Sequence, residues 1–414
     1  MQGTITCWKI RKYYYDNLLG ETMKILFLTA LYDPYIGGGA EISNKILIEG
    51  LKKKELDIEI ITLGENESLE EKEGIKIRRV KFNKILKKYL SSIKEKRKLL
   101  FIDKIKITIY KVILYFNILY KLKIEKLITE SNADIIHTSG VHLFFPQMWW
   151  KIAKKHKIKV IHTLRDPLFL YFRGKNLGKY YSILDIFQKK YYSYYIKNYV
   201  DMVHSPSRFM LEKHKKSGFI FKKEIVIYNT VVEMIEKNIN IEDKNIDIVY
   251  VGGIDNHKGI NTLIELKKMS VDLKIVCVGD GKLKEECLKN LIDVTGWLSR
   301  KEVYNYIKKS KILILPSEWE EAFGRVLIEG IINGTLVIGS DQGAIPEILG
   351  NKDKYIFKAK NVIELYEKVK MILKLTEKEY KEELTIMQNY MRKYSYENHI
   401  KDFIKLYKNL LNKE

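Results

Sequence analysis

Two short apolar runs enclose one polar stretch in the last third of the chain, and this arrangement constrains the fold most. Residues 312–315 read Ile-Leu-Ile-Leu, and residues 335–339 read Thr-Leu-Val-Ile-Gly. Short apolar runs bounded by turn residues are typical of buried strands. After Pro316 and Ser317, a helix of about ten residues is predicted, and Gly334 suits its C-terminus. The sequence therefore predicts a strand, loop, helix and strand of a parallel sheet.

Two carboxylates mark this unit, because Glu321 lies at the mouth of the predicted helix and Glu329 lies deeper along it. In a continuous helix they would stand roughly 12 Å apart at about 1.5 Å per residue. Helix N-termini attract phosphate, and ligands of parallel sheets bind outside the carboxyl ends of the strands. A long ligand with a sugar, a diphosphate and a ribose would fit, and Gly324 would let the diphosphate approach the backbone.

This stretch, together with Gly-Ala-Ile-Pro-Glu at residues 343–347, resembles the Glu-x7-Glu signature of retaining glycosyltransferases with the GT-B fold, in particular glycosyltransferase family 4. The resemblance implies that Glu321 contacts the donor sugar and that Glu329 holds the ribose. It also implies that the backbone amides of Phe323 and Gly324 meet the diphosphate. The alternative interpretation is a solvated helix face that carries two charges.

A glycine-rich loop follows the first strand-like run and contains Gly38 and Gly39, with Glu41 directly after. It does not match the GxGxxG dinucleotide pattern, so a nicotinamide cofactor is not supported. Amides of such a loop can bind phosphate. The loop is similar to the family's Gly-Gly-Ala-Glu loop, which implies that Gly38 and Gly39 face the donor phosphate and the acceptor. A merely permissive turn is the competing interpretation.

The second half opens with a loop from Gly252 to Gly259 that contains Lys258. The family usually has an arginine at the position of Gly253, and a lysine that matches Lys258; both contact the diphosphate. Lys258 is therefore expected on the diphosphate, although half of the usual cationic pair is missing. Gly279 lies in a Val-Gly-Asp-Gly run that resembles another family loop near the nucleotide. Whether Arg325 or Arg165 replaces the missing arginine is left open.

Arg165 lies in the segment Val-Ile-His-Thr-Leu-Arg-Asp-Pro at residues 160–167. This segment resembles the family's Thr-Leu-His-Asp element, whose histidine is expected beside the donor sugar. Arg165 takes that position here and could bind the donor or a phosphorylated acceptor. His162 and His137 fall on predicted strands, and both are interpreted as structural histidines.

The length of 414 residues suits two domains, and alternating strand-like and helical runs favour parallel α/β sheets. The predicted fold class is α/β with the GT-B arrangement, in which two Rossmann-like domains face across a cleft. In the resembling family the last helix crosses back onto the first domain. The expected parts are an N-terminal extension (1–22), an acceptor-binding domain (23–230), a linker (231–245), a nucleotide-sugar domain (246–390) and the C-terminal helix (391–414).

The net charge of +22 suggests an anionic partner, or alternatively only a composition rich in Lys and Ile. No RNA- or DNA-binding motif is present, so nucleic acid is not expected. The segment Lys84–Lys126 carries thirteen basic and three acidic residues among apolar ones, and Tyr180–Tyr199 carries seven tyrosines. Such mixtures are typical of helices on an anionic membrane surface. Ordinary outer helices packed on the sheet are the alternative.

Three cysteines without CxxC spacing or a histidine cluster predict neither a disulfide framework nor a zinc site. No apolar stretch reaches 18 residues, and the first 22 residues do not look like a signal peptide. These patterns favour a cytoplasmic protein, with a peripheral place on the inner face of the membrane left open.

The resemblance implies a retaining glycosyltransferase that moves a sugar from a UDP- or GDP-linked donor to a lipid-linked or polysaccharide acceptor in glycan or cell-envelope biosynthesis. The nucleotide sugar is a co-substrate, and no metal or other cofactor is expected. The residues assigned to catalysis are Glu321, Lys258 and Arg165. The alternatives are a nucleotide-sugar epimerase of related architecture, and a non-catalytic nucleotide-sugar-binding subunit, which the glycine at position 253 keeps open.

Overall fold

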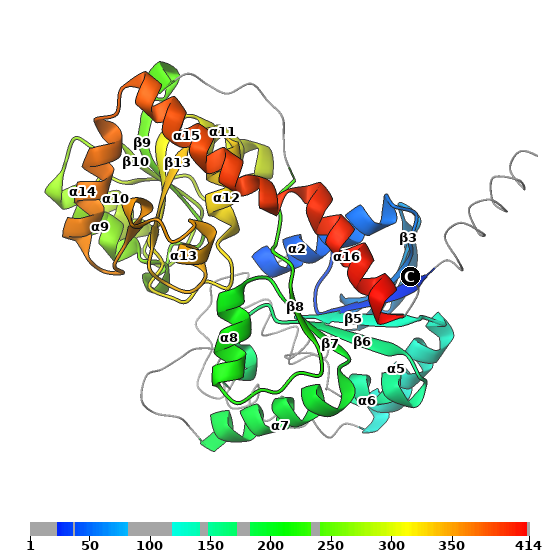
Figure 1. Cartoon of the computed structure of the whole chain (residues 1–414). Helices are drawn as coiled ribbons and strands as arrows, with labels where there is room; N and C mark the ends of the chain where they lie inside the picture. The colour runs from blue at the N-terminus through cyan, green and yellow to red at the C-terminus, as the bar shows by residue number, and fades with distance from the viewer. Residues whose placement is uncertain are drawn as a thin grey trace, which may run out of the picture. The chain divides into compact units, whose positions relative to one another are not determined.

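A computed structural model describes residues 23–35, 38–81, 118–140, 148–171, 183–232 and 241–411 (Figure 1). The contacts divide the chain into two compact units. The first contains the described residues up to Ser205, the range Glu212–Ile227 and the residues from Ile400 onward, and the second contains Pro206–Leu211 and Tyr228–His399. The predicted extension 1–22, most of the Lys84–Lys126 segment and residues 233–240 of the predicted linker lie outside the described residues.

The first unit holds a sheet of eight strands in the order β3-β4-β2-β1-β5-β6-β7-β8, parallel except for the antiparallel pair β3 and β4. The central strand β1 is an almost continuous apolar run, as expected for a strand buried on both faces, whereas in β5, β6 and β7 a buried histidine follows the apolar residues. The strands are β1 (Lys24–Thr29), β2 (Asp57–Gly64), β3 (Ser68–Lys72), β4 (Ile75–Lys81), β5 (Ile135–Ser139), β6 (Lys159–Thr163), β7 (Met202–Ser205) and β8 (Glu224–Val226).

Helices connect these parallel strands, as crossovers between parallel strands require. They are α2 (Gly39–Lys52), α5 (Ile118–Ser131), α6 (Met148–Lys155) and α7 (Ile183–Tyr199). Two more, α8 (Arg208–Lys216) and α16 (Tyr396–Leu410), begin with residues of the second unit and end with residues of the first. No helix within the described ranges is both long and apolar enough to cross a bilayer.

A buried row of polar side chains joins α16 to the sheet of the first unit. The His137 ring nitrogens lie 2.7 Å from the Tyr407 hydroxyl and 2.7 Å from the Thr163 hydroxyl. Thr163 Oγ1 is 2.9 Å from His204 Nδ1, and His204 Nε2 is 2.8 Å from the Ile227 carbonyl oxygen. His137 is therefore a structural histidine, as its place on a strand predicted. Burial above all, and then the neighbouring His204 and Arg165, lower the pKa of His137 well below its usual range.

The stability of this unit should consequently fall in acid. Unfolded His137 binds a proton near its ordinary pKa of about 6.5, whereas the folded state resists protonation, so stability is complete above that pH and falls below it. The loss should reach about 1.4 kcal/mol per pH unit from this group. Thermal unfolding from pH 7.5 to 5 measures it. A His137→Gln variant should be less stable at pH 7.5 but less sensitive to pH, whereas the exposed His156→Gln control should keep the wild-type dependence.

The second unit holds a fully parallel sheet of six strands in the order β11-β10-β9-β12-β13-β14. Its strands are β9 (Ile246–Val251), β10 (Ile275–Val278), β11 (Asp293–Val294), β12 (Ser310–Leu315), β13 (Leu336–Ser340) and β14 (Ile356–Phe357). Its helices are α9 (Ile260–Met269), α10 (Lys284–Lys289), α11 (Arg300–Lys308), α12 (Arg325–Ile332), α13 (Ile345–Ile348), α14 (Val362–Leu373) and α15 (Glu377–Met391), with the short 3-10 helix η3 (Asn256–Lys258) before α9. The two parallel-dominated sheets confirm the predicted α/β class.

The predicted start of the helix that carries Glu329 was wrong. The helix α12 begins only at Arg325 and has eight residues. Gly324, its N-cap, has a φ of 90°, a left-handed conformation that cannot continue the preceding chain as a helix. Glu321 therefore lies in the loop before the helix, and the separation calculated for a continuous helix does not apply. The predicted end is confirmed, because Gly334 has a φ of 78°.

Strand order creates one switch point in each sheet. In the second unit the chain runs from β9 outward through β10 and β11, and then returns to β12 on the other side of β9. In the first unit the corresponding reversal falls between β1 and β5. The loops that leave adjacent strands at a switch point diverge, and the space outside their carboxyl ends is where ligands of such sheets bind.

Candidate functional site

At the switch point of the second unit, three side chains from the loops after β9 and β12 converge. Lys258 Nζ lies 2.7 Å from Glu321 Oε1. Ser317 Oγ donates a hydrogen bond of 2.6 Å to the same carboxylate oxygen. The Lys258 side chain is 27% exposed and the Glu321 side chain 15%, so both are partly desolvated yet accessible from solvent. The arrangement presents one cation and one carboxylate side by side at the edge of the sheet.

Backbone packing fixes this pair. Gly259 has a φ of 76°, and a Cβ there would overlap the carbonyl oxygen of Pro316, so η3 packs directly on the end of β12. The carbonyl oxygen of His257 accepts the N–H groups of Glu318 (3.0 Å) and Trp319 (3.1 Å). These contacts join the loop that carries Lys258 to the loop that carries Glu321 without using either charged side chain.

A second glycine supports the glutamate loop from behind. Gly343 has a φ of 65°, and a Cβ there would overlap the backbone of Glu321. The next residue, Ala344, donates its N–H to the Glu321 carbonyl oxygen at 2.8 Å. The Gly-Ala pair after β13 thus holds the backbone of Glu321 in place.

Replacing Gly259 with alanine should therefore destabilise the second unit strongly. A left-handed φ alone costs a residue with a side chain about 1–2 kcal/mol, and the overlap with Pro316 should bring the total to at least about 3 kcal/mol. The matched control is Gly296→Ala, because Gly296 has nearly the same φ of 77° but no atom within 4 Å of its Cβ position. Denaturant unfolding of the two variants measures the difference. Equal losses would mean that the close approach to Pro316 is not required.

Glu329 lies in the second turn of α12 and is paired with two arginines. Its Oε1 is 3.3 Å from Arg325 NH2 and 3.5 Å from Arg300 NH2. Burial lowers the pKa of the Arg325 guanidinium, and the charge of Glu329 opposes that shift. Arg300 also donates a hydrogen bond of 2.7 Å from Nε to the Tyr304 hydroxyl. Glu329 therefore sits in a cationic setting next to the first turn of α12.

Phe323 and Gly324 contribute backbone groups, not side chains, to the candidate site. The Phe323 ring is buried, and its centroid lies 5.7 Å from that of Tyr394. A Cβ on Gly324 would point into the core at an ordinary distance of 3.5 Å from Leu315 and Leu327. Gly324 is thus required for its left-handed φ. Gly324 provides no side-chain cap for α12, and the Leu327 N–H donates to the Gly324 carbonyl oxygen at 3.1 Å. The positive end of the helix dipole at this terminus favours an anion.

Gly252 and Gly279 bring two neighbouring loops into backbone contact. A Cβ on Gly279 would overlap the carbonyl oxygen of Gly252. The hydroxyl of the buried Tyr250 donates a hydrogen bond of 2.7 Å to the Gly253 carbonyl oxygen and supports the same loop from beneath. A Cβ on Gly253 would find its nearest atom 3.8 Å away, on Asp255. The position that lacks the family arginine therefore has room for a side chain.

Arg165 belongs to a separate, buried network at the switch point of the first unit. Its Nε lies 3.0 Å from Ser139 Oγ and its NH2 2.7 Å from Asn44 Oδ1. Asn44 in turn donates a hydrogen bond of 3.0 Å to the Thr29 hydroxyl. The network thus connects the ends of β1 and β5 with the loop after β6.

Gly38 and Gly39 begin α2 beside this network. A Cβ on Gly39 would meet no atom within 4 Å, so the start of the helix is open. Burial raises the pKa of Glu41 in the first turn, while the charge of Arg165 acts in the opposite direction. His162 is buried, and its Nδ1 lies 2.8 Å from the Thr138 hydroxyl, which agrees with its interpretation as a structural histidine.

Several residues of these sites were not predicted as site residues. No ligand contact was predicted for Ser317, which was placed only at the end of a strand, or for Arg300. Arg300 directly follows Ser299, which caps α11 in a capping box with Glu302. The spacing of Ser317 four residues before Glu321 gives no signal by itself, since the contact arises in a loop. Within the described ranges, no cluster of three or more His, Cys, Asp or Glu side chains could hold a metal ion.

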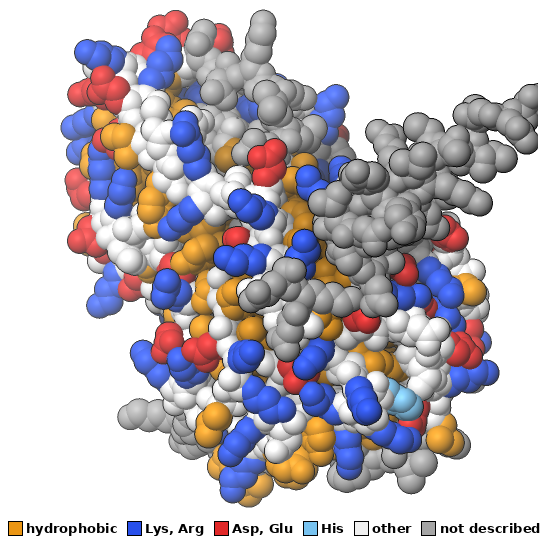
Figure 2. All heavy atoms as spheres, turned by 45° about the vertical axis from the view of Figure 1, so that its right-hand side comes forward, with side chains coloured by type: hydrophobic (Ala, Val, Ile, Leu, Met, Phe, Trp, Pro, Cys, Tyr) orange, Lys and Arg blue, Asp and Glu red, His pale blue; other side chains and the backbone are white. Residues whose placement is uncertain are grey.

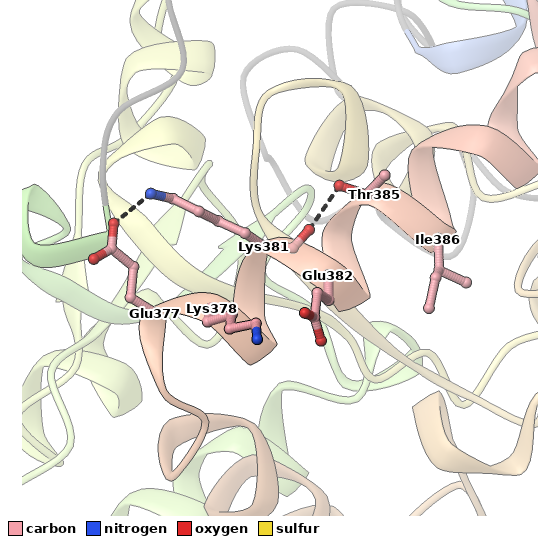
Figure 3. A pocket seen from close by; sticks show the side chains of 6 residues that line it. All are labelled: Glu377, Lys378, Lys381, Glu382, Thr385 and Ile386. Carbon is pink, nitrogen blue, oxygen red and sulfur yellow. Dashed lines mark hydrogen bonds and ion pairs between the residues drawn. The ribbon is translucent and has the colours of Figure 1, made fainter.

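A shallow depression over α15 does not qualify as a site (Figure 3). Its lining comes from one helix, and Lys381 and Glu377 of that lining form an ion pair with each other. No backbone amides or side chains from other elements converge on it. The depression has the chemistry of an ordinary solvated helix face.

Comparison with known proteins identifies the family to which the chain is similar. The model described as Glycosyltransferase Family 4 matches residues 37–233, and the model described as Glycosyl transferases group 1 matches residues 231–412. An uncharacterized 42.6 kDa protein in the cps region of Klebsiella pneumoniae is 28% identical over 347 residues, which cover 79% of this chain and 87% of that protein. The lipopolysaccharide 1,2-N-acetylglucosaminetransferase of Salmonella typhimurium is 28% identical over 134 residues, which cover 28% of this chain and 35% of that protein.

Among solved structures, HepE from Anabaena in complex with UDP has a TM-score of 0.67 at 14% identity, and the likeness covers 94% of this chain and 100% of HepE. At that identity the likeness shows the fold. The two family models together account for nearly all of the chain, and each matches one of the two regions that carry a switch-point cluster. The chain is a glycosyltransferase of the GT-B fold that resembles glycosyltransferase family 4.

Proposed function

We propose that the enzyme transfers a sugar from a nucleoside-diphosphate donor to a glycan or lipid-linked acceptor in glycan or cell-envelope biosynthesis, with retention of the anomeric configuration. One observation carries the proposal: Lys258, Glu321 and Ser317 meet at the switch point of the second unit, beside the uncapped N-terminus of α12. The names of the relatives support the substrate class, because one acts on lipopolysaccharide and HepE was solved with UDP.

The donor would occupy this edge in a defined order. The diphosphate would lie against Lys258 and the first amides of α12, where positive charge can stabilise the leaving group as it departs. Donor binding would separate Lys258 from Glu321, whose carboxylate would then accept hydrogen bonds from sugar hydroxyls. Glu329 would accept hydrogen bonds from the ribose. Arg165, in the first unit, would bind a phosphorylated acceptor. Neither a metal nor another cofactor enters this scheme.

Release of free sugar from the donor tests the proposal. Excess enzyme incubated with UDP-glucose, UDP-N-acetylglucosamine or GDP-mannose should slowly release the sugar of the correct donor, because transferases pass the sugar to water when no acceptor is present. Proton NMR of the first product should show the anomer of the donor. Absence of hydrolysis and of acceptor-dependent transfer with every donor would contradict the proposed function. An inverted product would contradict retention alone.

We also propose that the acceptor is lipid-linked and that the first unit contacts an anionic membrane through α7. Ile183, Phe187 and Tyr194 of this helix are 85%, 51% and 56% exposed, and the exposed Lys190 and Lys197 lie among them. Figure 2 shows blue basic and orange hydrophobic side chains next to each other on the lower part of the face that it draws. An apolar helix face that is flanked by lysines suits insertion at a negatively charged lipid surface.

Liposome co-sedimentation should therefore depend on lipid charge and on salt. The enzyme should sediment with vesicles that contain phosphatidylglycerol but less with pure phosphatidylcholine, and binding should fade at high ionic strength because lysine contacts of about 1 kcal/mol each are screened. Phe187→Ser should reduce binding severalfold. The control Ile363→Ser, at an even more exposed position on α14, should not. A protein that stays in the supernatant under all conditions would point to a soluble acceptor.

A further inference from the structure

Side chains of the second unit bind the first N–H groups of α8, whose first residues belong to that unit. Ser207 directly precedes the helix, and its Oγ accepts the N–H of Met210 at 3.2 Å, as an N-cap does. The Glu347 carboxylate accepts the N–H groups of Arg208 at 2.9 Å and of Phe209 at 3.0 Å. An α-helix leaves these groups without an internal partner, so the two side chains fix the start of α8.

The same serine also holds the loop that carries Glu321. Its hydroxyl donates a hydrogen bond of 2.7 Å to the carbonyl oxygen of Ala322. Ala322 stands between Glu321, the candidate sugar contact, and Phe323, whose amide is expected at the diphosphate. A hydroxyl has one proton and two lone pairs, so Ser207 can donate to Ala322 while it accepts from Met210. The N-cap of α8 is therefore a contact of the candidate site as well.

Glu347 completes a cycle of contacts around this loop. It lies in α13, three residues after Ala344, whose N–H donates to the Glu321 carbonyl oxygen at 2.8 Å. The Glu347 carbonyl oxygen accepts a hydrogen bond of 3.3 Å from the Tyr390 hydroxyl, which fixes α13 from a further side. The cycle runs from Glu321 through Ala344 to Glu347. It then passes to the first turn of α8 and returns through Ser207 to the residue after Glu321.

We propose that Ser207 and Glu347 are positioning residues, which hold Glu321 at the place where it meets the donor sugar. The inference rests on the proposed function, because that function assigns the sugar contact to Glu321. The contacts of the Glu321 side chain with Lys258 and Ser317 would change when the donor binds, whereas the cycle holds the backbone and does not involve the ligand. Displacement of a reacting group by about 1 Å can lower a rate about a hundredfold, so this support affects the reaction.

Transfer kinetics and nucleotide binding of two variants test this role. Glu347→Ala and Ser207→Ala should each lower kcat by roughly tenfold to hundredfold, because Glu321 loses its fixed position. Their affinity for UDP or GDP, whichever the wild type binds, should fall only a few-fold, since the proposed ribose contact, Glu329, lies outside the cycle. Glu347→Gln keeps one acceptor oxygen for the start of α8 and should recover part of the rate.

Thr376→Ala is the matched control, because Thr376 caps α15 through the Glu379 N–H, and α15 contributes no residue to the proposed site. It should lower the unfolding midpoint, as Ser207→Ala does, but leave kcat unchanged. If one of the two test variants does not unfold cooperatively, the other still breaks the cycle at its own link and decides the question.

Three results would overturn the positioning role while the proposed function stands. They are a wild-type kcat in both test variants, an equal loss of kcat in Thr376→Ala, and a nucleotide affinity that falls as much as kcat does. If the wild type binds neither UDP nor GDP, the nucleotide site itself fails, and the inference fails with it.

Discussion

Lys258→Ala should lower kcat by about 10²–10³, the range expected when one preorganised charge-stabilising group is removed from a reaction centre. KM for the donor should rise as well, because the same ammonium binds the diphosphate in the ground state. The expectation of one dominant cation follows from the glycine at position 253, which supplies no charge where the resembling family has an arginine. Steady-state transfer or donor hydrolysis measures both constants.

Two further variants test whether the charge of Lys258 causes the expected loss of rate. Lys258→Arg keeps the charge and should recover part of the lost rate. Gly253→Arg should raise donor affinity, since the nearest atom to its Cβ position is 3.8 Å away and its φ is not left-handed. An unchanged kcat in Lys258→Ala would assign leaving-group stabilisation to another cation, and Arg325, whose guanidinium lies in the first turn of α12, would be the next residue to test.

The two signature carboxylates should separate in their effects on nucleotide binding. Glu329→Ala should weaken free nucleoside diphosphate as well as donor by roughly tenfold to hundredfold, as expected for lost hydrogen bonds to a charged group. Glu321→Ala should leave the affinity for free nucleotide nearly unchanged yet abolish transfer, because its proposed partner is the sugar. Calorimetric titration with nucleotide and an assay of transfer distinguish the two. Equal nucleotide affinity in wild type and Glu329→Ala would contradict the ribose assignment.

The central strands could be predicted from sequence because their physical cause is local. A strand buried on both faces of a parallel sheet is a continuous apolar run, as in Ile312–Leu315. The strand β3 could not be predicted in this way. Its sequence, Ser-Leu-Glu-Glu-Lys, is exposed throughout, and it forms a strand only because it pairs with β4.

The start of α12 depended on tertiary contacts that the sequence does not display. The segment before Gly324 is held in a loop because Gly343 packs on Glu321 and Gly259 packs on Pro316. Each contact joins loops from different strands. The resemblance assigned Lys258 and Glu321 to one ligand, but their direct pairing across 63 positions of sequence depends on the adjacency of β9 and β12.

The most direct test of the central claim, that the carboxyl edge of β9 and β12 binds the nucleotide of the donor, is thermal unfolding with nucleoside diphosphates. Ligand at about 100 times its Kd should add about 2.7 kcal/mol to the free energy of unfolding of the unit that binds it. The account predicts that UDP or GDP raises the unfolding midpoint of the wild type, and that Glu329→Ala shows a clearly smaller increase at the same concentration, about 0.4–1.4 kcal/mol in the free energy of unfolding. No stabilisation of the wild type by either nucleotide, or an equal rise in Glu329→Ala, would contradict it.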